Sequence, residues 1–222
     1  MAFRAVLLDL YDTLVWSEWP TMRAELEDEF GLDEAELVRA FVKTRPARSV
    51  GAYGSAEGDL RAVLVEAGLD PPAELVRQLS RDRVDRFLTH GVHLWEDSIP
   101  TIRALRERGI RSAVVSNCDH STRPVVERLG LVEETDAVVL SFEVGVAKPD
   151  AGIYLEALSR LEARPQDALF VDDQALYCDG AVAVGIRSLL IDRGHGVEQE
   201  GPDAGGHPVI AGLEAVLDLV SR

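Results

Sequence analysis

Four short apolar runs of the sequence each end in residues that could do chemistry. In chain order these residues are Asp9 to Thr13, Ser116 with Asn117, Lys148 with Pro149, and Asp172 with Asp173. Carboxylates beside a buried apolar run cost free energy unless a cation neutralises them. Aspartates that converge with one lysine are therefore a donor set for a hard, oxygen-ligated cation such as Mg²⁺. Helix capping explains any one of these positions, but it explains all four in this order poorly.

The lysine of this set stands out because the chain has only one other. Of the 23 basic residues, 21 are arginine, and only Lys43 and Lys148 are lysine. Lysine carries a compact point charge and arginine a planar fork, so a site that needs the first cannot simply accept the second. We interpret Lys148 as a functional charge and Lys43 as a solvated helix residue.

Short apolar strands must position these residues, and the pattern after Asp97 alternates strands with helices. The run from Phe3 to Leu10 is typical of a strand buried on both faces. Further strands are predicted over 112–115, 137–140, 168–171 and 188–191, and helices over 99–108, 122–129, 153–161, 180–184 and 213–220. Such alternation predicts a doubly wound parallel α/β sheet, in which ligands bind at the carboxyl ends of the strands.

Between the first strand and this region, residues 17–90 have helical periodicity. Met22, Leu26 and Phe30, for example, recur at helical spacing. Pro46 and nearby glycines predict a loop over 45–58. We therefore expect an α/β core of residues 1–15 and 92–222 and a small all-helical cap of residues 16–91. The glycine-rich segment 194–208 is expected to be a surface loop.

The overall composition restricts the partners and the compartment. The 222 residues are 46% hydrophobic, which excludes global disorder. The net charge of −16 disfavours nucleic acid, because an acidic chain repels its phosphates. The sequence has no uncharged apolar stretch of about 18 residues, so it predicts no membrane span. The first apolar run lacks a signal-peptide pattern. Two cysteines, Cys118 and Cys178, are too few for a disulfide scaffold and favour a reducing, cytoplasmic compartment.

Taken together, the four segments resemble the motifs of the haloacid dehalogenase (HAD) superfamily of aspartyl-nucleophile hydrolases. The resemblance covers almost the whole chain and keeps the family order, from an Asp-x-x-x-Thr motif at Asp9 to the acid pair ending at Asp173. It implies a Rossmann-like core. The helical segment after the first motif resembles the cap of those members whose cap is inserted there and closes over the substrate.

The resemblance also implies a role for each catalytic motif residue. Asp9 is expected to be the nucleophile of a covalent aspartyl intermediate that water hydrolyses. Ser116 and the Asn117 amide are expected to hold the transferring group. Lys148 is expected to neutralise Asp9 and the bound anion, and Thr13 to position the first loop.

A metal and a small anionic substrate follow from the same resemblance. Mg²⁺ is expected to bind Asp9, the Tyr11 carbonyl, Asp173 and, directly or through water, Asp172. The substrate is expected to be a small phosphorylated metabolite or a halogenated acid, bound by a monomer or homodimer. The cap is expected to choose the substrate, with Trp16, Arg45 and Arg48 as the candidate contacts.

The first motif departs from the phosphatase pattern at its third residue. Phosphatases of the family usually carry there a second Asp, which protonates the leaving oxygen, whereas this chain has Tyr11. Tyrosine, with a pKa of about 10, is a poor proton donor near neutral pH. The family's dehalogenases share this tyrosine and need neither acid nor metal, because halide leaves without a proton. They lack the acid pair, which this chain keeps at Asp172 and Asp173.

We therefore expect a Mg²⁺-dependent phosphatase that is slow or prefers good leaving groups such as acyl or aryl phosphates. The acid pair favours this hypothesis, because three carboxylates repel a haloacid unless metal fills the site. One alternative is a 2-haloacid dehalogenase, which would release halide in the presence of EDTA. The other is a catalytically weak family member with a binding or regulatory role, in which Asp9→Asn would change nothing.

Overall fold

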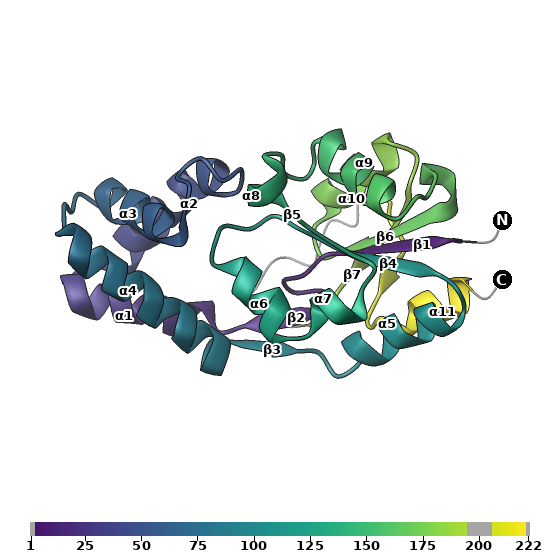
Figure 1. The fold of residues 1–222 in the computed structure, drawn as a ribbon, viewed down its shortest axis with the longest axis horizontal. Helices are drawn as coiled ribbons and strands as arrows, with labels where there is room; N and C mark the ends of the chain where they lie inside the picture. The colour runs from purple at the N-terminus through teal and green to yellow at the C-terminus, as the bar shows by residue number, and fades with distance from the viewer. Residues whose placement is uncertain (1–2, 195–205, 221–222) are drawn as a thin grey trace.

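A six-stranded parallel sheet forms the centre of the computed structural model, which describes residues 3–194 and 206–220 (Figure 1). Its strands are β1 (Ala5–Leu8), β4 (Arg111–Ser116), β5 (Ala137–Leu140), β6 (Ala168–Asp172), β7 (Arg187–Ile191) and β8 (Val209–Ile210). They lie in the order β5-β4-β1-β6-β7-β8, and each pairing is parallel. The predicted doubly wound α/β fold is confirmed, and of the six strands of this sheet only the short β8 was not expected.

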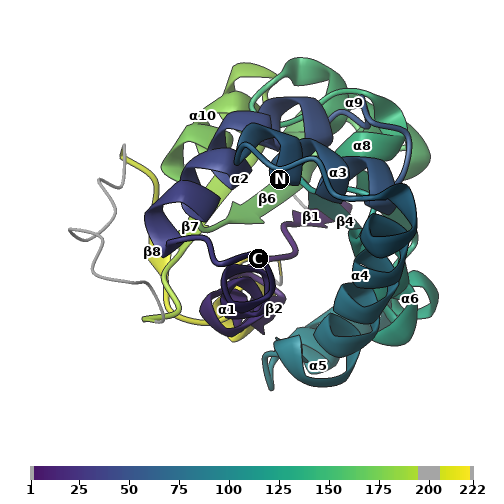
Figure 2. The same ribbon diagram turned by 90° about the vertical axis from the view of Figure 1, so that its left-hand side faces the viewer.

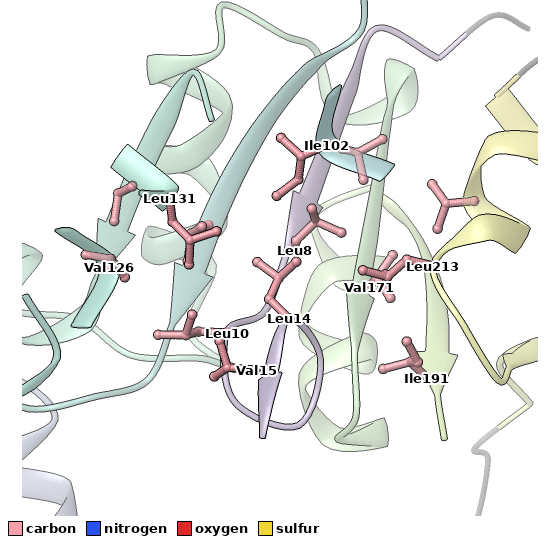
Figure 3. Packing of buried hydrophobic residues seen from close by; sticks show 14 of the residues in the cluster. Leu8, Leu10, Leu14, Val15, Ile102, Val126, Leu131, Val171, Ile191 and Leu213 are labelled. Carbon is pink, nitrogen blue, oxygen red and sulfur yellow. The ribbon is translucent and has the colours of Figure 1, made fainter. Parts of the chain in front are cut away.

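Alternate residues of β1 enter two different apolar layers, which is why its sequence is apolar throughout. Val6 and Leu8 pack in one layer with α5 (Ser98–Glu107), α6 (Thr122–Arg128), α7 (Leu131–Glu134) and α11 (Glu214–Val220). Figure 3 shows Leu8 in this layer with Ile102 and Val171. Ala5 and Leu7 pack in the other layer with α9 (Ala151–Arg160) and α10 (Ala175–Ala183). The sheet is thus covered on both faces, and its strand ends are left for a site.

Four helices form a separate unit at one end of the molecule (Figure 1). They are α1 (Trp19–Phe30), α2 (Glu34–Arg48), α3 (Ala56–Glu66) and α4 (Ala73–Arg86), followed by a π-helical turn, η1 (Phe87–Gly91). Leu37, Leu64 and Val76 belong to an apolar cluster of their own between these helices. Figure 2 looks onto this unit, with α2, α3 and α4 nearest the viewer. We call these helices the cap.

Two short antiparallel strands connect the cap to the sheet. β2 (Val15–Ser17) pairs with β3 (Val92–Leu94), so the chain leaves the core and returns to it at one place. The expected boundaries of the cap, after residue 15 and after residue 91, fall at this ribbon. No helix in the described part of the chain is long and apolar enough to cross a membrane.

The predicted loop over 45–58 was wrong in its first part, because α2 continues to Arg48 with Pro46 inside it. The proline lies in the last turn, where its missing N–H removes little of the helical hydrogen bonding. The Arg48 side chain fixes this end of the helix by donating to the Thr44 hydroxyl (3.1 Å) and the Phe41 carbonyl (3.0 Å). Arg45 and Arg48 are therefore helix residues, and the connection is only 49–55.

Smaller departures concern elements with little periodicity. α10 begins at Ala175, five residues before the predicted helix at 180–184, and the short α8 (Ser141–Val144) and η2 (Pro165–Asp167) were not expected. These are too short, or in the case of α10 too uniformly apolar, to carry an amphipathic pattern. Of the expected surface loop at 194–208, residues 195–205 lie outside the described residues.

A buried ion pair holds the loop after β1 beside the residues that follow β7. Arg193 donates to both carboxylate oxygens of Asp97 (2.8 and 2.9 Å) and to the carbonyl of Thr13 (2.6 Å). The Leu213 amide also donates to Asp97 (2.7 Å). Burial opposes ionisation of Asp97, but these hydrogen bonds outweigh it and lower its pKa.

Replacing Asp97 by asparagine is expected to lower the free energy of unfolding by about 3 kcal/mol, because it leaves the Arg193 charge buried without a counterion. Only 8% of the Arg193 side chain is exposed. The matched control is Asp70→Asn, which breaks the pair of Asp70 with Arg61, where 83% of the Asp70 side chain is exposed. Urea unfolding should show a loss of at most about 1 kcal/mol there. Equal losses in the two variants would contradict a structural role for the Asp97 pair.

Candidate active site

Three carboxylates lie together at the carboxyl ends of β1 and β6. Asp9 follows β1, and its amide donates to the Val171 carbonyl (2.9 Å), so the chain still runs beside β6 at this point. Asp172 is the last residue of β6, and Asp173 comes directly after it. One oxygen from each of the three lies within 4.8 Å of the others. The parallel register therefore brings together the three aspartates that were expected to meet.

Lys148 is inserted between two of these acids. Its ammonium donates to Asp9 Oδ1 (2.5 Å) and Asp172 Oδ2 (2.6 Å), and 1% of the side chain is exposed. Burial disfavours the charged form, but the two carboxylates raise the pKa of Lys148 above its ordinary value. The ammonium therefore stays charged at neutral pH.

Asn117 positions this lysine through its backbone. The Asn117 side chain accepts from the Lys148 amide (2.7 Å) and donates to the Lys148 carbonyl (2.8 Å). The side-chain amide of Asn117 is therefore already used to hold Lys148 in place. This pairing of two motifs was not foreseen from the sequence, where they are 31 residues apart.

The acid cluster has the chemistry of a divalent cation site. Burial and the nearby Asp9 charge raise the pKa of Asp173 to about 6, and burial raises that of Asp172 as well. One ammonium does not balance three carboxylates, so these acids repel one another in the absence of a cation. Carboxylate oxygens are the ligands that Mg²⁺ prefers. The donor set fits Mg²⁺, and the Tyr11 carbonyl as a further ligand stays a prediction.

Ser116 ends β4 and presents an unused hydroxyl at the same edge of the sheet. Its Oγ is buried and has no hydrogen-bond partner within residues 3–194 and 206–220. A buried hydroxyl without a partner is unusual in a folded protein and is available to an oxygen of a ligand. Thr13 is fully buried, and its carbonyl accepts from Arg193; its positioning role in the first loop stays a prediction.

The surroundings of the Tyr11 side chain disfavour a proton-donating role. Its hydroxyl shares a hydrogen bond with the Thr122 hydroxyl (3.1 Å), and its ring contacts Trp19 and Phe87. Burial raises the pKa of Tyr11 further above that of an ordinary tyrosine. This residue therefore gives up a proton even less readily than a solvated tyrosine.

A cleft of about 450 Å³ separates these strand ends from the cap. Asp9, Ser116, Lys148 and Asp173 line its core side, and Arg45 and Arg48 line its cap side. The volume is typical of a site for a small molecule. The structure thus brings the core residues and both arginines to one cavity.

The two arginines differ in what they bind. Arg48 is buried and forms an ion pair with Asp119, a core residue just beyond Ser116. Arg45 is exposed in the cleft, and its side chain has no ion-pair or hydrogen-bond partner among the residues that the structure describes. Burial raises the pKa of Asp9, and the charge of Arg45 is one of the contributions that lower it. Arg45 is therefore the free cation on the cap side, whereas Arg48 fastens the cap to the core.

Trp16 was expected to contact the substrate, and the structure places it elsewhere. It lies on β2 and stacks on His93 of β3, with ring centroids 4.3 Å apart. The tryptophan that lines the cleft is Trp19, three residues later at the start of α1. The pairing of β2 with β3 decides which ring faces outward, and a pattern this short gave no signal for it.

A second contact between cap and core was missed altogether. Asp59 on α3 accepts from both the amide (3.1 Å) and the ring Nδ1 (2.7 Å) of His120. Nearby, Gly51 lies so close to the core that a Cβ atom there would be 2.4 Å from the Phe142 carbonyl oxygen. The cap therefore contacts the core through Asp59 and Gly51 as well as through the β2–β3 ribbon.

Three further residues near the site are structural. Tyr154 is buried and donates to the Tyr177 carbonyl (2.7 Å), so it packs inward from α9. Cys118 and Cys178 lie in the two different apolar layers, and burial raises the pKa of each thiol to about 12. They cannot pair with each other across the sheet.

The sequence and the fold are similar to those of proteins already characterised. A family model described as haloacid dehalogenase-like hydrolase matches residues 3–185. The glyceraldehyde 3-phosphate phosphatase of Methanopyrus kandleri is 32% identical over 203 residues, covering 86% of this chain and 84% of that protein. The haloacid dehalogenase-like hydrolase domain-containing protein 3 of Mus musculus is 43% identical over 93 residues, which span 41% of this chain and only 37% of that protein.

Among solved structures, a 2-haloacid dehalogenase from Pseudomonas syringae pv. Tomato DC3000 has the same fold. It superposes with a TM-score of 0.72 at 22% identity, with 99% of each chain covered. The similar proteins are thus named for both phosphate and halide chemistry, and the choice between the two rests on the residues of the site.

Proposed function

This chain belongs to the haloacid dehalogenase-like hydrolases, and from that premise we propose that it is a Mg²⁺-dependent phosphatase acting on a small phosphorylated metabolite. The cluster of Asp9, Asp172 and Asp173 carries the proposal. Even a carboxylate substrate, which brings a single charge, is repelled by three acids that share one ammonium. A dianionic phosphate beside three acids needs a divalent cation as well.

The core residues have distinct tasks in this reaction. Asp9 is the nucleophile, and Lys148 holds one of its two carboxylate oxygens. Ser116 donates its unused hydroxyl to a phosphoryl oxygen, and Arg45 supplies a second positive charge to the bound anion. When bound to the acids, Mg²⁺ would neutralise charge on the phosphoryl group and on the carboxylates that approach it.

Two displacements at phosphorus complete the turnover. First, an Asp9 oxygen attacks phosphorus, the bond to the alcohol oxygen breaks, and that oxygen leaves with the electron pair. Water then attacks the aspartyl phosphate at phosphorus, the bond to Asp9 breaks, and Asp9 recovers its carboxylate. Inorganic phosphate is released, and the proton lost by the water reaches the departed alkoxide through solvent.

Chelation of the metal is the direct test of this proposal. Purified protein with acetyl phosphate and Mg²⁺ should release inorganic phosphate, and excess EDTA should lower the rate by roughly a hundredfold, because a metal ion contributes several kcal/mol to such a transition state. Adding back Mg²⁺ should restore the rate, which excludes an effect of EDTA on the fold. Phosphate release that EDTA leaves unchanged would contradict the proposal.

Tyr11 favours one second candidate, a 2-haloacid hydrolase, because halide needs no proton to leave. The discriminating substrate is 2-chloropropionate, assayed for chloride with EDTA present. Metal-independent chloride release would replace the phosphatase by this activity. A cytoplasmic location and a monomeric or homodimeric state stay predictions from the sequence.

A further inference from the structure

Three aromatic rings form one wall of the cleft next to the nucleophile. Tyr11 comes from the first catalytic loop, Trp19 from the start of α1 and Phe87 from the end of the cap, and all three line the cavity with Asp9. Trp19 and Phe87 are stacked, with centroids 4.8 Å apart and planes inclined by 24°, and Tyr11 lies 6.0 Å from Trp19. We call this set the aromatic wall.

The three rings of the wall differ in exposure: Phe87 is buried in the apolar layer of Val6 and Leu8, Tyr11 packs against that layer, and Trp19 is exposed. Trp19 is 38% exposed although it is among the largest side chains of the molecule. A large ring left open inside a cavity is a binding feature more often than a packing feature. Phe41, Leu60 and Val84 extend the apolar lining across the cap.

Most polar side chains on the cap side of the cleft already have protein partners. Arg23 is bound to Glu34, Arg83 donates to the Met22 carbonyl (2.6 Å), and Arg48 is bound to Asp119. The side chain of Arg45, the buried Nε of Arg23 and the buried Oδ1 of Asp59 have no partner in the described part of the chain. An apolar leaving group relies on the rings of the lining and needs none of these polar groups.

The chemistry at the other end of the cleft points to the same kind of leaving group. Tyr11 holds the place of the proton donor, and its hydroxyl is bound to Thr122. Without a donor the leaving oxygen departs as an anion. A phenol has a pKa of about 10, as in the tyrosine side chain, whereas an aliphatic alcohol is close to water at about 15.7. Departure as an anion is therefore far easier for a phenol.

We infer that the substrate is a phosphate monoester of a phenol, whose ring stacks on Trp19 while its phosphate meets Asp9. This inference rests on the proposed phosphatase function and names the substrate class of that site. The reaction is balanced without a protein acid. The P–O bond breaks, its electron pair leaves with the phenoxide oxygen, and solvent water protonates the phenoxide after release.

Four substrates separate the contribution of the leaving group from that of the wall. Phenyl phosphate and benzyl phosphate share an aromatic ring but differ in the pKa of the leaving group. Benzyl phosphate and glycerol 1-phosphate differ in the apolarity of the leaving group. Acetyl phosphate reports the core chemistry alone. We expect kcat/KM to fall from phenyl to benzyl and again from benzyl to glycerol 1-phosphate, by at least about tenfold at each step.

The decisive variant is Trp19→Ala. It is expected to lower the ratio of kcat/KM for phenyl phosphate to that for acetyl phosphate by about tenfold, and Trp19→Phe is expected to restore most of the ratio. Trp16→Ala is the matched control, because that ring stacks on His93 outside the cleft. Its ratio should equal that of the parent protein.

Two results together would overturn the inference: glycerol 1-phosphate is hydrolysed as fast as phenyl phosphate, and Trp19→Ala leaves the ratio of kcat/KM for phenyl phosphate to that for acetyl phosphate unchanged. The proposed phosphatase function would still hold. If none of the four compounds releases phosphate, the proposed function fails instead. Calorimetric titration with phenylphosphonate then decides the inference by itself. Binding that Trp19→Ala weakens supports an aromatic subsite, and absence of binding overturns it.

Discussion

Replacement of Asp9 by asparagine is expected to lower the rate of phosphate release by at least about 10⁴-fold, because the reaction loses its nucleophile. An amide oxygen is a far weaker nucleophile than a carboxylate, and asparagine keeps the size of the side chain. The change also removes one of three mutually repelling buried acids while Lys148 keeps its bond to Asp172. The variant should therefore fold, and a thermal melt checks that it does. Phosphate release from acetyl phosphate with Mg²⁺ measures the loss.

Asp150→Asn is the matched control for this experiment. Asp150 lies two residues after Lys148, and its exposed side chain caps α9 by accepting from the Gly152 amide (2.7 Å). Asparagine caps helices about as well as aspartate, so this variant should keep the parent activity. Full activity in Asp9→Asn, from protein shown to be free of other phosphatases, would remove Asp9 from the mechanism. If instead neither the parent protein nor Asp9→Asn released phosphate, and ligand binding were unchanged by the substitution, the non-catalytic alternative would be favoured.

Replacement of Tyr11 by aspartate is expected to raise the rate on aliphatic phosphates such as glycerol 1-phosphate by about 10² to 10³-fold. The variant supplies a carboxyl group where the fold now holds a phenol whose pKa is too high to donate, and general acid catalysis is worth about this much. Phenyl phosphate should gain much less, because phenoxide leaves without a proton. The gain should therefore differ between the two substrates when both are assayed with Mg²⁺.

Tyr11→Asn separates the acid from the loss of the ring. It removes the same aromatic group and the same bond to Thr122 as Tyr11→Asp, but it carries no proton to donate. Equal activity of the two variants on glycerol 1-phosphate would show that space, and not acid catalysis, limits the parent protein. No gain from Tyr11→Asp in a folded protein would count against the account of the leaving group.

The core of the site was predictable because strand pairing in a parallel sheet places residues that are far apart in the sequence side by side. The register pairs Leu8 with Val171, so the residues that follow, Asp9 and Asp172, become neighbours although 163 positions separate them. An apolar run of four or five residues ending in an acid is visible in the sequence. Once the strands were assigned to one sheet, their carboxyl ends had to share one edge.

The cap side was less predictable because its contacts follow no repeating pattern. Asp59 and His120 meet across 61 residues, and neither position has a signature in the sequence. The position of Trp16 outside the cleft has the same cause, since a three-residue strand gives too little alternation to show which way its ring points. The end of α2 was misplaced because Pro46 is read as a helix breaker, whereas in a last turn it is tolerated.

The β2–β3 ribbon has a consequence for how such a protein can change over evolutionary time. Ser17 and Val92 are paired neighbours, so the intervening segment begins and ends at one point of the core, and it encloses its own apolar cluster. Insertions with adjacent ends disturb a host domain little. The segment is thus a replaceable module, which recombination can exchange as a whole. Asp9, Asp172, Asp173 and Lys148 lie outside this segment. An exchange of the segment therefore changes which molecules enter the cleft, while the reacting groups stay the same.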